Sequence, residues 1–432
     1  MPASLIVFRT DASREIGTGH VMRCLTLASA LRESGATVEF ICREHAGHLC
    51  DLLEQRGFTV RRLPAFDAGD ANDFGGFGMQ GGFSPSATPL PLPASADRDG
   101  KSAKPGDPAH AAWLGCDWTQ DAAQSVAAIA SMAARPGWLI VDHYALDYRW
   151  QRVLRTQTGH IMVIDDLADR QHDCDLLLDQ NLVPEMASRY ARLVPNQCTC
   201  LLGPQYALLQ PLYADLRAQR KQRQDPPRRI FAFFGGFDAG NLSGMAVDAF
   251  LALHAARLDA GLQLDLVFSG NSPHAFAIQK LARQHANIHL YSQLPSLAPL
   301  MAVADLALGA GGATTWERLC LGLPALIVTV AHNQCASAGE QQAQGLVHVL
   351  GHAGEVSSAT MLAALQRVLD DGVAALVPVD LSAVVDGCGV QRVLDKLQQQ
   401  LPQQLQDHLQ QRALQQGNPQ SIEQGANHVK PD

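Results

Sequence analysis

The sequence predicts an α/β protein made of two Rossmann-like, doubly wound domains that face a cleft. Three observations lead to this prediction. Short apolar runs alternate with stretches of helical periodicity in both halves of the chain. Each half opens with an apolar run that leads into a glycine-containing turn. A polar stretch ending at Pro226 and Pro227 separates the halves, and 432 residues suit two domains at roughly 100–200 residues each.

The first domain is expected to span residues 1–213. Its predicted strands are apolar runs at 5–8, 37–41, 59–60, 138–141, 161–164 and 176–178. Its predicted helices lie between them, at 21–31, 48–56, 120–134 and 147–157. This alternation is typical of a parallel sheet with helices on both faces.

A segment at about 67–111 interrupts the first domain. Its composition shifts to Gly, Pro, Ser, Ala and Asp, and it shows neither strand nor helix periodicity. We interpret it as a disordered surface insertion. A functional lid is the alternative, since long loops are often functional, but this composition offers little apolar area for docking.

Residues 214–228 are expected to form a linker, because consecutive prolines continue neither a helix nor a central strand. The second domain is expected at 229–397. Its predicted strands are at 229–234, 264–268, 288–291, 306–308 and 325–328, with helices at 242–256, 274–284, 314–321 and 335–343. Residues 398–432 are rich in Gln and are expected to be disordered.

Composition narrows the classes of function. The net charge of −9 argues against a nucleic-acid-binding protein, which would carry a basic excess. The sequence shows no membrane span or signal peptide, so we expect a cytoplasmic protein. The ten cysteines suit buried, reduced thiols, and Cys198 and Cys200 lack the spacing of a zinc site. We expect no metal and no cofactor.

The first candidate site is the turn at 9–20, which follows the first strand and contains Gly17, Gly19 and His20. Glycines there let the backbone approach a ligand closely. His20 is the best-placed base at the start of the following helix. A plain strand-to-helix turn with a solvent-facing histidine remains an alternative, since single Gly-x-Gly turns are weak signals.

The second candidate is the glycine-rich turn at 309–313 with Gly312, which runs into Thr314, Thr315 and Glu317. Its amides can attract a phosphate, and the Glu317 carboxylate can accept both ribose hydroxyls. The alternative is a tight turn in which two threonines cap a helix. The turn matches neither the Walker loop nor the dinucleotide fingerprint.

Three further loops follow predicted strands, where ligands bind in parallel sheets. Gly236 would let a diphosphate approach, although a simple turn is equally compatible. Asn333 and Gln334 could bind sugar hydroxyls or phosphate, or belong to a plain surface loop. The segment 142–147 places an acid, an imidazole and the phenol of Tyr144 beside the cleft, although Asp147 could serve only as a helix cap.

The neighbouring pair Asp165 and Asp166 raises a metal site as an alternative, of the kind that nucleotide-sugar transferases with one α/β domain use. No third oxygen ligand can be placed nearby from the sequence.

Together, the segments 9–25, 142–147, 202–209 and 309–318 resemble the UDP-2,4-diacetamido-2,4,6-trideoxy-β-L-altropyranose hydrolases of pseudaminic acid biosynthesis. The resemblance spans about residues 5–395, apart from the insertion. It implies a glycosyltransferase-B-type fold related to the lipid-II-forming N-acetylglucosaminyltransferase. It also implies metal-independent release of UDP, with water as acceptor and with inversion at the anomeric carbon.

The resemblance assigns roles to single residues. The family's catalytic histidine falls on His20, which would deprotonate water, while Asp11 and Tyr144 would help to place sugar or water. Glu317 takes the ribose position. The other residues expected around the diphosphate and sugar are Gly19, Gly236, Gly312, Thr314, Thr315, Asn333 and Gln334.

We therefore expect a monomeric enzyme that acts on a small UDP-sugar, with possible contacts to neighbouring pathway enzymes and none to nucleic acid or membrane. One rival is a glycosyltransferase that moves an amino sugar from a UDP-sugar to a hydroxyl acceptor. The other is a non-enzymatic binding or scaffold protein that uses the insertion and the tail for partners.

Overall fold

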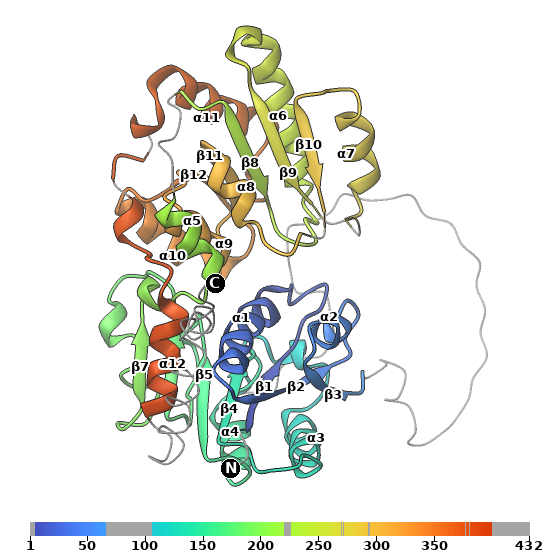
Figure 1. Ribbon diagram of the computed structural model, residues 1–432, viewed down its shortest axis with the longest axis vertical. Helices are drawn as coiled ribbons and strands as arrows, with labels where there is room; N and C mark the ends of the chain where they lie inside the picture. Colours follow the sequence, from blue (N-terminus) through green and yellow to red (C-terminus); the bar gives the residue numbers. More distant parts are fainter. Residues whose placement is uncertain are drawn as a thin grey trace, which may run out of the picture.

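The computed structural model contains two parallel β-sheets, each covered by helices (Figure 1). It describes residues 5–65, 106–219, 226–268, 270, 272–292, 294–375, 377–379 and 381–399. The prediction of an α/β protein with two Rossmann-like domains is confirmed. Residues 400–432 of the expected 398–432 tail and most of the expected 67–111 insertion lie outside the described residues, whereas residues 398 and 399, which were expected to be disordered, are the last two residues of a helix.

The first sheet has seven parallel strands in the order β3-β2-β1-β4-β5-β6-β7. The strands are β1 (Leu5–Thr10), β2 (Thr37–Arg43), β3 (Thr59–Leu63), β4 (Trp138–Asp142), β5 (His160–Ile164), β6 (Leu176–Asp179) and β7 (Thr199–Leu202). Every residue of β1 and β4 is buried, as expected for central strands covered on both faces. The sequence analysis did not identify β7, because its apolar pattern is less clear than that of the other strands.

Two separate apolar cores cover the two faces of this sheet. The side chains of Ile6 and Phe8 join one core, and those of Leu5 and Val7 join the other, because successive strand residues point to opposite faces. The helices of this half are α1 (Gly19–Glu33), α2 (Cys50–Gln55), α3 (Trp118–Ala130) and α4 (Tyr148–Arg155), with the short turns η1 (Ala111–Leu114), η2 (Met186–Ser188) and η3 (Pro204–Tyr206). This half is therefore doubly wound, as predicted.

The second sheet has six parallel strands in the order β10-β9-β8-β11-β12-β13. They are β8 (Arg229–Phe233), β9 (Gln263–Val267), β10 (Ile288–Tyr291), β11 (Leu306–Ala310), β12 (Ala325–Thr329) and β13 (His348–His352). The helices are α5 (Pro211–Ala218), α6 (Leu242–Ala256), α7 (Ala275–Ala282), α8 (Ala298–Val303), α9 (Thr314–Cys320), α10 (His332–Ala343), α11 (Ser358–Asp371) and α12 (Gly389–Gln399), with turns η4 (Leu258–Ala260), η5 (Val373–Ala375) and η6 (Leu381–Ala383).

The chain crosses between the two halves twice. Tyr213 of α5 is buried in the core of the second sheet, although it lies before the expected linker. Helix α12 returns to the first sheet, where Val393 and Leu397 join the same core as Phe8, and Figure 1 shows α12 beside β7. We therefore propose a domain division that assigns α5 to the second domain and α12 to the first.

Residues 106–111, which the sequence analysis placed at the end of the insertion, are part of the described fold. Asp107 forms an ion pair with Arg149 of α4 at 3.1 Å. None of the helices in the described ranges is both long enough and apolar enough to span a membrane.

The packing of α12 leads to a stability prediction. Replacing Leu397 by Ala should destabilise the first domain by about 2–5 kcal/mol, because its 1% exposed side chain fills that core. Hydrogen exchange should therefore increase in α1 more than in α6. The matched variant Asp395→Ala, on the exposed face of α12, should change neither. Faster hydrogen exchange in α6 alone would contradict the assignment of α12 to the first domain.

Candidate functional site

His20 and Asp142 form a buried pair at the carboxyl ends of β1 and β4. His20 is the second residue of α1 and is 7% exposed, while Asp142 ends β4 and is fully buried. The Nδ1 atom of His20 lies 2.6 Å from Oδ1 of Asp142. Because a carboxylate accepts hydrogen bonds, Nδ1 carries a proton and donates it to Asp142. The neutral ring then keeps Nε2 as its free acceptor.

Arg23 fixes the carboxylate that holds His20. Its Nε and one terminal nitrogen donate to the two oxygens of Asp142 at 2.6 and 2.7 Å. Burial would raise the pKa of Asp142, but the charge of Arg23 and the hydrogen bonds from Arg23 and His20 outweigh it, so that the pKa lies below its usual range. Asp142 is therefore a permanent carboxylate that orients the imidazole.

Tyr144 forms one side of the His20 environment. Its ring meets the His20 ring edge-on, with centroids 4.5 Å apart. Its hydroxyl donates to Asp166 at 2.6 Å, and Arg23 donates to the same Asp166 oxygen at 2.6 Å. Burial, followed by the charge of Asp166, raises the pKa of Tyr144 well above its usual value. Tyr144 is thus a neutral phenol whose proton is directed at Asp166.

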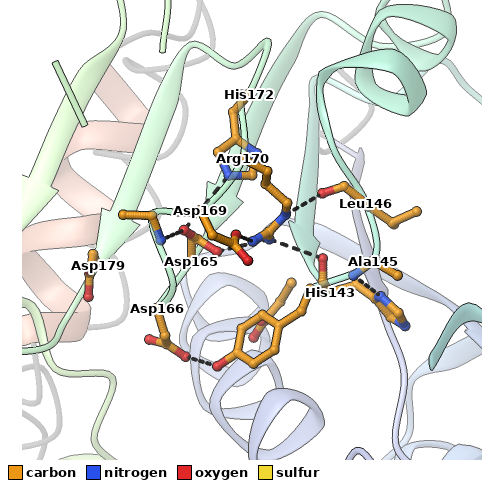
Figure 2. Close-up of polar contacts among 12 residues, drawn as sticks. His143, Ala145, Leu146, Asp165, Asp166, Asp169, Arg170, His172 and Asp179 are labelled. Atoms are coloured by element: carbon orange, nitrogen blue, oxygen red, sulfur yellow. Dashed lines mark hydrogen bonds and ion pairs between the residues drawn. The ribbon is translucent and has the colours of Figure 1, made fainter. Parts of the chain in front are cut away.

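Arg170 ties the loop after β4 to the loop after β5, as Figure 2 shows. Its guanidinium donates to the Leu146 carbonyl at 3.0 Å and pairs with Asp165 at 2.9 Å and with Asp169 at 2.8 Å. The loop that carries Tyr144 is therefore held in one conformation. Asp147, at its end, accepts from the amide of Arg149 at 2.9 Å and caps α4, which was the simpler of the two interpretations.

Asp11 lies beneath the site. It is fully buried, pairs with Arg9 at 2.6 Å and accepts from the amide of Arg43 at 2.7 Å. Burial opposes ionisation, but Arg9 and the imidazoles of His143 and His45 keep the pKa of Asp11 well below its usual value. These contacts favour a structural role for Asp11 over the role in placing sugar or water that the resemblance implies.

His143 is also buried rather than open to a ligand. Its Nδ1 accepts from the amide of Ala145 at 3.1 Å, which places its proton on Nε2, 3.3 Å from Asp11 (Figure 2). Burial lowers the pKa of His143, despite the opposing effect of Asp11. His143 is therefore a neutral ring that connects the Tyr144 loop to the buried ion pairs.

The turn before His20 is fixed by local hydrogen bonds. The hydroxyl of Ser13 accepts from the amides of Glu15 and Ile16, and Gly17 closes the turn with a φ of 79°. That φ favours glycine because a side chain would be strained there. Gly19 begins α1, and a side chain in its place would meet no atom within 4 Å. Its backbone is therefore open to approach, as predicted.

The glycine turns of the two domains face each other. A Cβ atom placed on Gly236, after β8, would lie 3.8 Å from the Thr18 hydroxyl. The neighbouring Asp238 accepts from the amides of Leu242 and Ser243 and so fixes this turn onto α6. His20 and the second domain's first loop therefore lie on opposite sides of one interdomain boundary.

The loops after β11 and β12 meet in the second domain. The side chain of Gln334 accepts from the Val330 amide at 3.0 Å and reaches the Gly311-Gly312 turn, where a Cβ on Gly312 would lie 3.5 Å from its amide nitrogen. Thr314 is half-buried at the start of α9, and Asn333 is exposed at the start of α10. Four of the predicted residues are thus brought together.

Glu317 follows one turn later and has an oxygen in need of a donor. The buried Oε2 atom has no hydrogen-bond partner, while the hydroxyl of Tyr213 donates to the carboxyl group. Burial raises the pKa of Glu317 to about 7, against the smaller effects of Tyr213 and Arg318. A carboxyl group in this state suits a ligand with hydroxyl donors.

Thr315 does not face a ligand. Its hydroxyl accepts from the buried Arg318 at 2.8 Å, and Arg318 also donates to the Ala310 carbonyl at 2.7 Å. A side chain on Gly309 would lie 2.6 Å from both Arg318 and the Phe233 carbonyl oxygen, so only glycine fits there. Thr315 therefore supports the turn, in contrast to the predicted contact with substrate.

Asp165 and Asp166 do not form a shared ligand set. Asp165 is directed at Arg170 and Tyr190, while Asp166 accepts from Arg23, Tyr144 and Asn181. Within the described ranges, no cluster of three His, Cys, Asp or Glu side chains has the geometry to hold a metal ion.

The sequence analysis placed the acid of segment 142–147, Asp142, beside the cleft and raised Asp166 only as a metal ligand, but it did not assign either residue, or Arg23, to the support of His20. Two features of the sequence could have indicated the partners of His20. Arg23 follows His20 by three residues in a helix, which places both side chains on one face. Asp142 ends a wholly apolar strand, where a lone carboxylate has to find a partner.

Comparison with known proteins confirms the resemblance. No family model matches this chain. Over 201 residues it is 27% identical to the UDP-2,4-diacetamido-2,4,6-trideoxy-β-L-altropyranose hydrolase of Campylobacter jejuni, which covers 46% of this chain and 69% of the relative. Over 205 residues it is 28% identical to the spore coat polysaccharide biosynthesis protein SpsG of Bacillus subtilis, covering 45% of this chain and 57% of that one. The match thus spans little more than half of SpsG.

The solved structures similar to this chain confirm the glycosyltransferase-B-type fold. MurG of Acinetobacter baumannii superposes with a TM-score of 0.56 at 13% identity, covering 92% of this chain and all of MurG. A putative UDP-N-acetylglucosamine 2-epimerase of Listeria monocytogenes gives 0.51 at 12% identity, covering 91% and 95%. At these identities the likeness concerns the fold alone.

The pairing of His20 with Asp142 predicts a single tautomer. In its neutral form, His20 should carry its proton on Nδ1 and leave Nε2 unprotonated, because the Asp142 carboxylate accepts a hydrogen bond from Nδ1. Long-range ¹H–¹⁵N correlation spectra of ¹⁵N-histidine-labelled protein report this directly, with His20→Gln identifying the signal. A neutral His20 protonated on Nε2 would refute the arrangement.

Proposed function

We propose that this protein is an enzyme that hydrolyses a UDP-sugar to UDP and the free sugar, with His20 as general base. The observation that carries the proposal is the His20–Asp142 pair, 2.6 Å apart, at the boundary where the glycine turns of the two domains meet. A histidine oriented by a buried carboxylate is suited to take a proton from water at neutral pH.

The reaction breaks one bond and forms one. Water attacks the anomeric carbon while its proton passes to Nε2 of His20, and the bond from that carbon to the UDP oxygen breaks. UDP leaves with the electron pair. Asp142 stabilises the imidazolium that forms, because the carboxylate lies against Nδ1. Direct attack by one water inverts the configuration at the anomeric carbon.

The UDP moiety is assigned to the second domain. Gly312 lies beside Gln334, where the lack of a side chain lets a diphosphate approach the backbone, and Glu317 offers an unpartnered oxygen to the ribose hydroxyls. Gly236, facing Thr18, would bring the sugar end toward His20. Asn333 and Thr314 complete this set as proposed contacts with substrate.

The relatives point to the identity of the sugar. One of them is named for UDP-2,4-diacetamido-2,4,6-trideoxy-β-L-altropyranose, and we propose this UDP-sugar as the substrate and pseudaminic acid biosynthesis as the pathway. We propose chemistry without a metal, since the carboxylates beside His20 are paired with Arg23 and Arg170.

A glycosyltransferase is the second candidate, favoured by the fold of MurG alone. It would use the same His20 base on the hydroxyl group of an acceptor. The two candidates differ when no acceptor is present, because only the hydrolase then releases free sugar.

Removing the base should abolish turnover but spare binding. His20→Ala should lower kcat by about 10²–10⁴-fold, and Asp142→Asn should lower it by at least about tenfold through misorientation of the ring. The Kd for UDP should stay within about twofold in both. His285→Ala, in the other domain, is the matched control and should retain full activity. Release of UDP by His20→Ala at the normal rate would refute the role of His20.

Binding of a UDP-sugar should release a proton through Glu317. Ribose hydroxyls that donate to the carboxylate favour its charged form and lower a pKa that lies at about 7 in the free protein. About half a proton should leave at pH 7 and none at pH 9. Calorimetry with UDP-N-acetylglucosamine in buffers of different ionisation enthalpy measures this number.

Glu317→Gln should remove the proton release and weaken binding, whereas Glu340→Gln on α10 should change neither. If Glu317→Gln released the same number of protons, another group would be the source.

A further inference from the structure

An aromatic surface continues outward from His20 over elements that the proposed mechanism does not use. The Tyr144 ring touches His20, and the ring of Trp113 lies almost parallel to that of Tyr144, with centroids 5.7 Å apart and an interplanar angle of 26°. His110 packs against both, at 4.3 Å from Trp113 and 5.5 Å from Tyr144. Three rings thus extend from the base in one contiguous cluster.

The segment that carries Trp113 and His110 is anchored to the first domain. Asp107 pairs with Arg149 at 3.1 Å, and Leu114 is buried in the core that contains Leu5 and Val7. Gly115 follows with a φ of 74°, and a side chain there would lie 2.9 Å from the His45 ring. The two rings are therefore held in place by the fold.

The rings differ in burial, and this difference indicates that Tyr144 has a different role from Trp113 and His110. Tyr144 is 5% exposed, and its hydroxyl is directed at Asp166, so it supports the cluster from below. Trp113 and His110 are only half-buried, so part of each residue is exposed. A rigid aromatic surface next to a catalytic group suits the apolar face of a ligand.

We propose that Trp113, supported by His110 and Tyr144, is the platform on which the sugar of the substrate stacks through its apolar face. This inference rests on the proposed function, which places the anomeric carbon beside His20. We place the sugar ring beside Tyr144, on the side where Trp113 is stacked, because the Tyr144 ring contacts both His20 and Trp113. The ligand class that fits is a deoxy, N-acetylated sugar, whose methyl groups and ring C–H bonds provide apolar surface.

The test separates contacts with the sugar from contacts with UDP. In the full chain, Trp113→Ala should raise KM for UDP-2,4-diacetamido-2,4,6-trideoxy-β-L-altropyranose by about tenfold, with a smaller change in kcat. The Kd for UDP, which lacks the sugar, should stay within about twofold. Trp113→Phe keeps an aromatic face and should restore KM to within about threefold of wild type.

Phe276→Ala is the matched control, because Phe276 is an exposed aromatic side chain in the second domain that belongs to none of these ring contacts. It should leave KM unchanged. An unchanged KM in Trp113→Ala, or an equal rise in the Kd for UDP, would overturn the platform.

Measurements on the wild-type protein distinguish a failure of the proposed function from a failure of the aromatic platform. If wild type bound the UDP-sugar without hydrolysing it, the same comparison of Trp113 variants would be made with Kd values for the UDP-sugar and for UDP. If wild type bound neither, both proposals would fall.

Discussion

A carboxylate without solvent exposure has to be surrounded by donors, and Asp142 meets this constraint with His20 and Arg23. Removing one partner of such a buried pair costs about 3–5 kcal/mol, so the three side chains define one another's positions. Arg23 then reaches Asp166, and Asp166 receives the hydroxyl of Tyr144. One buried charge at the end of β4 thus sets the ring of His20, the first turn of α1 and the loop after β5.

The second domain supplies the groups that we propose to bind UDP, which the network around Asp142 lacks. The first domain offers a base and aromatic surface, whereas the second domain offers the glycine turn at Gly312 beside Gln334 and an unpartnered carboxyl oxygen on Glu317. The contact between Gly236 and Thr18 brings the two halves of the site to one boundary. The return of α12 to the first core ties the halves together at the far end of the chain.

The sequence was sufficient for the fold class because buried parallel strands are continuous apolar runs, as in β1, β4 and β12. It was also sufficient to locate the glycine turns, whose φ angles and close contacts only glycine tolerates.

The sequence was not sufficient to show which polar residues point outward. Asp11 and Thr315 looked like ligands for substrate, yet one oxygen of Asp11 pairs with Arg9 and the hydroxyl of Thr315 accepts from Arg318. The pairing of Asp142 with Arg23 was missed because a contact across 119 residues leaves no local pattern. His110 was assigned to the insertion by its composition, whereas the ring contacts that place it are tertiary.

The attack of a water molecule activated at His20 on the anomeric carbon of a UDP-sugar can be followed with ¹⁸O. Turnover of UDP-2,4-diacetamido-2,4,6-trideoxy-β-L-altropyranose in ¹⁸O-labelled water without acceptor, followed by mass spectrometry and NMR, identifies the labelled product. We expect ¹⁸O in the anomeric hydroxyl of a free sugar with inverted configuration, and unlabelled UDP. Label in UDP, or no free sugar at all, would contradict this mechanism.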